Sequence, residues 1–132
     1  MTTILICLLI GVLLPYVVAG LTAPYRSRQF GKIELNTPRA QESELTDAGH
    51  RASASQSNAW EALTAFGAAN LMAHLAGVDP AAGWSTAAMI WAAARIVHPI
   101  AYIADVAALR VLAFAVGMFM NFWIVYLAFA AV

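Results

Sequence analysis

A charge-free apolar run from Thr2 to Leu21 is the feature that most constrains the fold of this chain. A helix needs about 20 predominantly apolar residues to cross the roughly 30 Å hydrocarbon core of a bilayer, and this run is long enough. Apolar residues make up 62% of the 132 residues, well above the roughly 45–50% of soluble domains. We therefore expect an integral membrane protein. The run lacks the basic segment and cleavage pattern of a removable signal peptide, so we expect it to remain as the first span.

Three further apolar stretches follow, separated by a polar loop and two turns. The polar loop covers residues 22–50, and the turns lie at Gly77-Val78-Asp79-Pro80 and near Asp105. The sequence thus predicts a single all-α domain, residues 1–132, in which four transmembrane helices pack as a bundle. The predicted spans are approximately residues 2–21, 51–76, 81–102 and 106–132.

The basic residues are distributed unequally among the connections. The first loop contains several of them, the second turn has none, and Arg110 lies near the third connection. Cytoplasmic loops carry an excess of Lys and Arg, so we predict a multi-pass protein of the cell (inner) membrane with the first and third connections in the cytoplasm and both termini outside. Seven basic residues balance seven acidic ones, so no net positive charge indicates nucleic-acid binding.

Charged and amide side chains recur inside these apolar spans, where each charge costs on the order of 2.5–3.5 kcal/mol and usually faces a bundle interior or cavity. At about 100° per residue they form stripes rather than a scatter. The second span carries one stripe within about 120°, made of Arg51, Ser55, Asn58 and Glu61. The third carries Arg95, His98 and Tyr102 within about 60°, with Trp91 beside them. The fourth adds Arg110, followed on roughly the same face by Phe114, Gly117 and Asn121.

The predicted topology places these stripes in the cytoplasmic half of the membrane. At 1.5 Å per residue, Glu61 lies about 15 Å beyond Arg51, and Arg95 lies about 10 Å back from Tyr102. A pocket there would combine guanidinium groups with a carboxylate, an amide, an imidazole and a phenol. Such a set suits a ligand that bears both carboxylates and an ammonium group.

Structural interpretations of the same residues remain open. Arg51 and Arg110 could extend to the membrane interface, and Glu61 could pair with Arg95 to hold the bundle together. The other polar positions favour packing or interface roles: His98 taken alone, Asn70 and His74 near the outer end, Asn121 between helices, and Trp84 in an aromatic belt. No metal-binding cluster, glycine-rich phosphate loop or serine nucleophile with a base is found. The single Cys7 excludes an internal disulfide.

The run from Arg51 to Glu61, followed by Phe66, resembles the second-helix motif of the MAPEG family, the membrane-associated proteins of eicosanoid and glutathione metabolism. The match is an Arg, an Asn seven residues later and a Glu three further on. The segment from Ala94 to Tyr102 resembles the third-helix pattern of that family, and Arg110 falls near its fourth-helix arginine. The resemblance covers essentially the whole chain and points to a bacterial-type member.

This resemblance implies a left-handed four-helix bundle that assembles as a homotrimer, with glutathione bound between neighbouring subunits toward the cytoplasm. Glutathione would be the co-substrate, and an apolar small molecule the second substrate. Arg110 would be the catalytic residue, because a nearby guanidinium favours the reactive thiolate of a thiol whose ordinary pKa is near 8.5. The implied glutathione contacts are Arg51, Asn58, Glu61, Arg95, His98 and Tyr102.

Three functions are consistent with these features. The first is a glutathione transferase or peroxidase that acts on apolar electrophiles, with Arg110 stabilising the thiolate. The second is a non-enzymatic membrane scaffold or small-molecule-binding subunit of the same fold, since Ala62 stands where several eicosanoid-making members have an aromatic residue. The third is a transporter-like pore, which four short spans without an inverted repeat make the weakest of the three.

Overall fold

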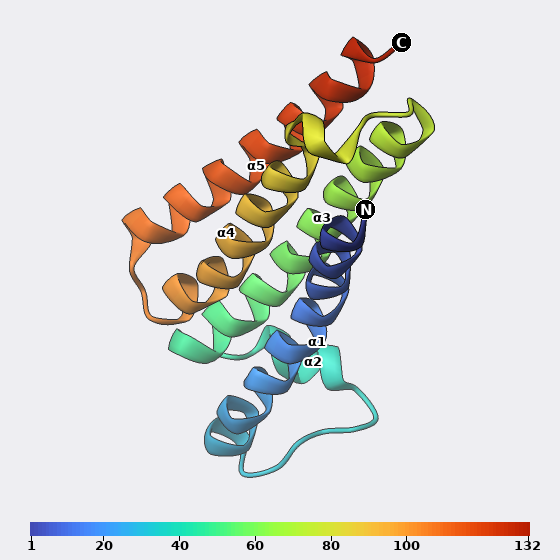
Figure 1. Ribbon diagram of the computed structural model, residues 1–132. Helices are drawn as coiled ribbons and strands as arrows, with labels where there is room; N and C mark the ends of the chain where they lie inside the picture. The colour runs from blue at the N-terminus through green and yellow to red at the C-terminus, as the bar shows by residue number, and fades with distance from the viewer.

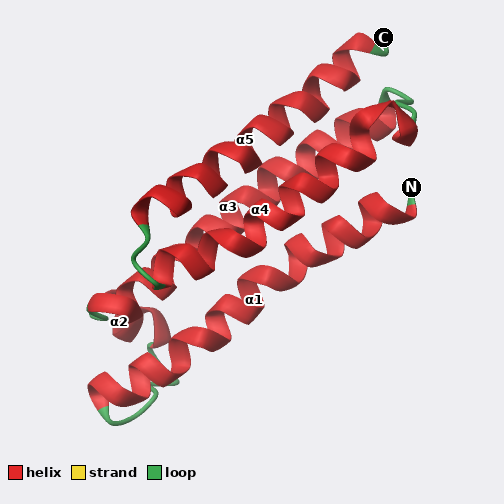
Figure 2. Ribbon diagram, turned by 60° about the vertical axis from the view of Figure 1, so that its left-hand side comes forward, coloured by secondary structure: helices red, strands yellow, loops and turns green.

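The computed structural model describes all 132 residues, and every element in it is helical. Four long helices lie side by side, and their termini and connections alternate between two ends of the molecule (Figures 1 and 2). Both chain termini and the α3–α4 connection lie at one end, and the α1–α3 and α4–α5 connections lie at the other. The elements are α1 (Thr2–Phe30), α2 (Pro38–Ser43), α3 (Asp47–Leu75), the π-helical turn η1 (Pro80–Trp84), α4 (Ser85–Ile103) and α5 (Ala107–Ala130).

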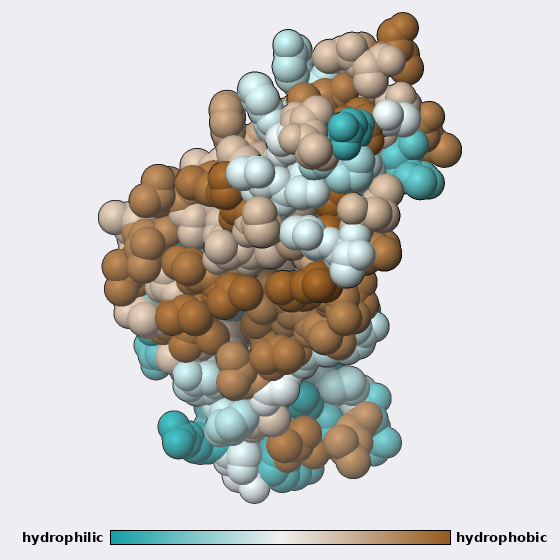
Figure 3. Space-filling model, in the orientation of Figure 1, coloured by the Kyte–Doolittle hydropathy of each residue, from teal (hydrophilic) through white to brown (hydrophobic).

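Three helical segments are long and apolar enough to cross a membrane: α1, the η1–α4 segment and α5. The surface agrees with this, because rows of large apolar side chains on α1 and α5 are exposed, among them Leu9, Leu13, Val17, Phe122 and Phe129. On the face drawn in Figure 3, apolar residues form a broad belt, and polar residues gather below it where α1 ends and α2 lies. The chain is thus a multi-pass membrane protein. Helix α3 is as long as α1, but its polar stripe lowers its mean hydropathy.

The expected loop over residues 22–50 is wrong in its boundaries. Helix α1 continues past Leu21 to Phe30, with Pro15 and Pro24 inside it, and α3 begins at Asp47. Proline removes one backbone donor but leaves the remaining hydrogen bonds of a long helix in place. Only a short connection remains between α1 and α3, and it contains the helix α2.

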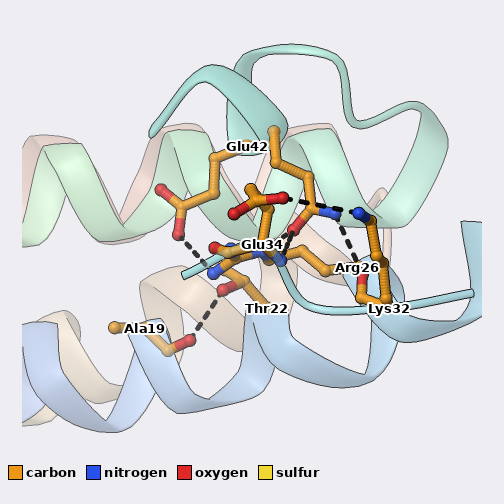
Figure 4. Close-up of polar contacts among 7 residues, drawn as sticks. Ala19, Thr22, Arg26, Lys32, Glu34 and Glu42 are labelled. Atoms are coloured by element: carbon orange, nitrogen blue, oxygen red, sulfur yellow. Dashed lines mark hydrogen bonds and ion pairs between the residues drawn. The ribbon is translucent and has the colours of Figure 1, made fainter. Parts of the chain in front are cut away.

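Arg26, on the extended part of α1, organises this connection (Figure 4). Its Nε donates to Gln41 Oε1 at 2.8 Å, its Nη2 donates to the Glu34 carbonyl at 2.8 Å, and its Nη1 lies 3.5 Å from Glu42 Oε1. The Gln41 amide in turn donates to the Lys32 carbonyl at 2.9 Å. A hydrogen bond from the Asn36 backbone N–H, helped by the charge of Lys32, lowers the pKa of the Glu34 carboxyl. Arg26 is only 7% exposed, and these contacts provide hydrogen-bond acceptors for its buried guanidinium group. They therefore stabilise the part of α1 that continues beyond the apolar run.

The two predicted turns are confirmed, and they share one geometry. After α3, Gly77 N–H donates to His74 O and Val78 N–H donates to Ala73 O. After α4, Asp105 N–H donates to Tyr102 O and Val106 N–H donates to Ala101 O. Both are Schellman motifs, which require a left-handed residue just beyond the helix end. Gly77 (φ 71°) and Asp105 (φ 61°) are those residues.

Aromatic and small residues build the core between the helices. The rings of Phe66 on α3 and Trp91 on α4 stack with centroids 3.7 Å apart. Gly11 lets α1 approach this pair, since a Cβ there would lie 3.1 Å from Trp91 Cη2. Trp84 was expected in an aromatic belt but is buried, and its indole N–H donates to Asn70 Oδ1 at 2.7 Å. The expectation is wrong because Asn70 supplies an internal hydrogen-bond acceptor that lipid lacks.

Candidate functional site

A cavity of about 130 Å³ opens between α3, α4 and α5. Helix α3 forms one wall of it, and α4 together with α5 forms the other. Three of the residues expected to bind a ligand, Asn58, Glu61 and Arg95, line it. The full lining is Asn58, Glu61, Ala62 and Ala65 from α3, Trp91 and Arg95 from α4, and Phe114, Gly117, Met118 and Asn121 from α5.

Arg95 is the most deeply buried charge of the cavity, with only 2% of its surface exposed. Its Nη2 donates to Asn58 Oδ1 at 2.7 Å and to the Asn58 carbonyl at 3.3 Å. Its Nε has no hydrogen-bond partner within the protein. Asn58, seven residues after Arg51 on the α3 stripe, is therefore the side chain that orients the guanidinium group.

Glu61 shares the cavity with Arg95 but does not form an ion pair with it. The three ion pairs of the structure involve Arg26, Lys32 and Arg51 instead. The interpretation in which Glu61 and Arg95 pair to hold the bundle together is thus not what the structure contains. A buried cation and a carboxylate that are not paired with each other leave both charges available to a zwitterionic ligand.

Gly117 makes room for Arg95. A Cβ at this position would lie 3.3 Å from Arg95 Cδ, closer than an ordinary van der Waals contact, and 3.9 Å from Trp91 Nε1. Glycine on α5 therefore lets the side chains of two α4 residues reach the cavity wall. Sequence reasoning grouped Gly117 with Arg110 on one helical face, and the structure shows what the missing side chain permits.

Three other expected site residues, Arg110, Tyr102 and His98, form a series of contacts beside the cavity. The Arg110 guanidinium lies over the Tyr102 ring, 4.6 Å from its centroid, a cation–π geometry. The Tyr102 ring meets the His98 ring edge to face at 5.6 Å, and His98 lies 6.5 Å from Phe114. Phe114 lines the cavity, so the series connects Arg110 to the cavity through aromatic rings. Arg110 forms no ion pair, which leaves its charge free.

Arg51 lies apart from the cavity, at the start of α3. Its Nε donates to the Ile103 carbonyl at 3.3 Å, and its Nη1 lies 3.7 Å from Asp105 Oδ2. These contacts join α3 to the turn between α4 and α5. Its expected contact with glutathione stays a prediction.

Seven of the ten lining residues were not among the expected ligand contacts, and two of these seven, Trp91 and Asn121, carry a polar side-chain group. Both are more than nine-tenths buried. The sequence pattern places Trp91 beside the α4 stripe and Asn121 on the α5 face that follows Arg110, and Asn121 was interpreted as a contact between helices. The spacing already placed them there, because Trp91 precedes Arg95 by four residues and Asn121 follows Gly117 by four, so each pair shares one helical face.

The cavity can hold a charged ligand within an apolar bundle. Arg95 and the amide of Asn58 supply donors for a carboxylate, Glu61 supplies an acceptor for an ammonium group, and Arg110 supplies a nearby unpaired cation. In a bundle of low dielectric these charges act more strongly than they would in water.

A comparison with protein families agrees with this combination of helices and buried charges. The sequence profile of the MAPEG family matches residues 3–130, almost the whole chain. Comparisons with curated proteins and with solved structures found no match. Since the family profile covers nearly every residue of the helices that form the cavity, this chain belongs to the MAPEG family.

Proposed function

We propose that this protein binds glutathione in the α3–α4–α5 cavity and acts as a glutathione transferase or peroxidase on apolar electrophiles. The observation that carries the proposal is the pair of unmatched charges in one cavity, Arg95 and Glu61. Glutathione offers carboxylates, an ammonium group and a thiol. The guanidinium of Arg95 complements a carboxylate, and Glu61 complements the ammonium group.

The size of the cavity supports a site shared between copies of the chain. A volume of about 130 Å³ is close to that of cavities that hold one benzene, and a tripeptide is larger. The cavity opens beside Glu61, on a face of α3 where Trp60, Thr64 and Ala68 are also exposed. A carboxylate facing lipid is costly, so a neighbouring subunit covering this face would both complete the site and protect Glu61. We infer a homotrimer, which is the assembly that the resemblance to the MAPEG family implies.

In this proposal Arg110 stabilises the thiolate of the bound glutathione. Its cation–π contact with Tyr102 holds the guanidinium group in place. A free thiol is mostly protonated at neutral pH, and an adjacent positive charge raises the thiolate fraction, which is the reactive species. His98 and Tyr102 would position the same ligand from α4.

A thermal-shift titration of the purified protein in detergent tests ligand and charge recognition together. We expect glutathione to raise Tm saturably below millimolar concentration, and an analogue that lacks the glutamyl carboxylate to leave Tm unchanged. Light scattering of the same sample should give the mass of three copies of the 14.1 kDa chain. Glu61→Gln should weaken binding, whereas the exposed Arg28→Ala serves as a matched control. No shift up to millimolar glutathione would refute the proposal.

We further infer that α3 crosses the membrane as a fourth span and that the end bearing α2 faces the cytoplasm. Helix α3 packs against α1, α4 and α5, so lipid cannot surround those helices without reaching α3 as well. The basic residues Arg26, Arg28, Lys32 and Arg39 belong to the α2 end, as the positive-inside tendency requires. A reporter that is active only outside the cytoplasm should be active when fused after Val132 and inactive when inserted at Asn36.

The alternative function is a non-enzymatic binder that keeps the scaffold without turnover. The observation that favours it is the small side chain of Ala62 in the cavity lining, next to Glu61, because an alanine there gives little contact area to a second substrate. Turnover that depends on Arg110 excludes this alternative.

A further inference from the structure

The connection between α4 and α5 brings two arginines close to one carboxylate. Arg51 reaches it from α3, where its Nη1 lies 3.7 Å from Asp105 Oδ2 and its Nε donates to the Ile103 carbonyl at 3.3 Å. Arg110 belongs to the beginning of α5. Asp105 is the only acidic residue between residues 80 and 132. Two cations therefore compete for a single carboxylate, and in the structure Arg51 holds it.

The backbone makes Arg110 the natural alternative partner of Asp105. Val106 is the N-cap of α5, so Asp105 stands just before the cap and Arg110 is the fourth residue of the helix. Side chains at these two positions commonly pack against each other at a helix start. Arg110 nevertheless forms no ion pair, and its guanidinium group lies over the Tyr102 ring, 4.6 Å from the centroid.

The second contact of Arg51 explains why it holds the carboxylate. Its hydrogen bond to Ile103 reaches a carbonyl at the C-terminal end of α4, where a cation is favoured by the unpaired carbonyls and the helix dipole. The ion pair alone is weak, because the side chains of Arg51 and Asp105 are 27% and 73% exposed. The contact with α4 therefore favours Arg51 over Arg110 as the partner of Asp105.

We propose that Arg51 is a positioning residue for Arg110, because by pairing with Asp105 it keeps the carboxylate of this turn from neutralising Arg110. This role differs from the glutathione contact that the family resemblance implies for Arg51, which does not line the cavity. The kinetic part of the proposal rests on the proposed function. Its structural part does not, because the state of Arg110 is measured without glutathione.

Arginine side-chain resonances test the structural part in the full-length protein. The seven Lys and Arg residues include one lysine, so ¹⁵N labelling gives six arginine Nε–H signals, and Arg110→Lys assigns the one of interest. The Tyr102 ring should displace this signal from that of the exposed Arg28. We expect Arg51→Gln to remove the displacement, because Asp105 is then free to draw Arg110 from the ring. The double variant Arg51→Gln/Asp105→Asn should restore it.

Catalysis should follow the same pattern. Arg51→Gln should lower kcat about fivefold, the effect of one exposed ion pair, and this loss should shrink at high salt. Glutathione affinity should stay within about twofold, because Arg51 acts through Arg110. The double variant should recover kcat. Asp105→Asn alone should change neither quantity, since asparagine also tolerates left-handed backbone, and Asp79→Asn in the α3–α4 turn is the matched control.

The outcomes separate this proposal from the proposed function. An Arg110 signal that Arg51→Gln leaves in place, or a loss of kcat that Asp105→Asn does not repair, overturns the positioning role. Weaker glutathione binding in Arg51→Gln, with Arg110 unchanged, also overturns it and makes Arg51 a ligand contact. If the unaltered protein does not bind glutathione, the proposed function fails and the resonance still decides the role of Arg51. Near-UV circular dichroism checks folding, and Arg51→Met replaces Arg51→Gln if that variant is unfolded.

Discussion

Replacing Arg110 with alanine should slow glutathione conjugation of an aromatic electrophile by about 100- to 1000-fold, the usual cost of removing one group that stabilises developing or bound negative charge at an active site. The structure gives the reason for so large an effect. Arg110 lies over the Tyr102 ring at 4.6 Å and forms no ion pair, so nothing in the chain neutralises its charge. Glutathione binding should change by less than about threefold, because in the proposed site Arg95 and Glu61, not Arg110, would recognise the charged ends of the ligand.

The pH dependence separates this role from a structural one. If Arg110 stabilises the thiolate as proposed, the bound thiol of the unaltered protein should already be ionised at neutral pH, and kcat should be nearly constant above about pH 7. In Arg110→Ala the rate should keep rising toward the ordinary thiol pKa near 8.5. Arg110→Lys should recover part of the rate, since it keeps the charge but not the planar group. An equal loss of rate in the exposed Arg28→Ala, or an unchanged pH profile in Arg110→Ala, contradicts the assignment.

Replacing Arg95 with methionine should weaken glutathione binding by about 30-fold or more, the cost of removing one partner of a buried charge pair. The same change should leave Tm unchanged or raise it. A buried guanidinium without a carboxylate partner costs desolvation energy, and an apolar side chain of similar volume removes that cost. Opposite effects on binding and on stability are what a ligand residue shows and a packing residue does not.

Arg95→Lys is the control for charge, because lysine keeps the cation but cannot present the guanidinium fork to Asn58 and a carboxylate together. Its affinity should lie between those of the unaltered protein and Arg95→Met. Binding is read by calorimetry and stability by thermal unfolding in the same detergent. A lowered Tm with unchanged affinity in Arg95→Met would show that Arg95 only supports the bundle.

The helices and their turns were largely predictable because they depend on local sequence. The break after α3 and the turn near Asp105 follow from residues that favour or tolerate left-handed backbone. The C-terminal end of α1, which reaches Phe30, was not predictable from hydropathy. It is stabilised by the hydrogen bond from Arg26 to Gln41, which joins two segments of the chain. Trp84 shows the same limit, since its burial depends on Asn70, fourteen residues before it.

The membrane environment, the helical class and the stripes that contain Asn58, Glu61 and Arg95 follow from the sequence, because apolar run length and helical periodicity are properties of consecutive residues. The family follows from its motifs and from the family profile over residues 3–130. How the stripes meet depends on the packing of the helices. It pairs Arg95 with Asn58 rather than with Glu61, joins Arg51 to Asp105, and leaves Trp91 and Asn121 unpaired at the cavity. These contacts depend on how closely α3, α4 and α5 approach one another. Gly117 on α5 contributes to this, because it has no side chain to meet Arg95.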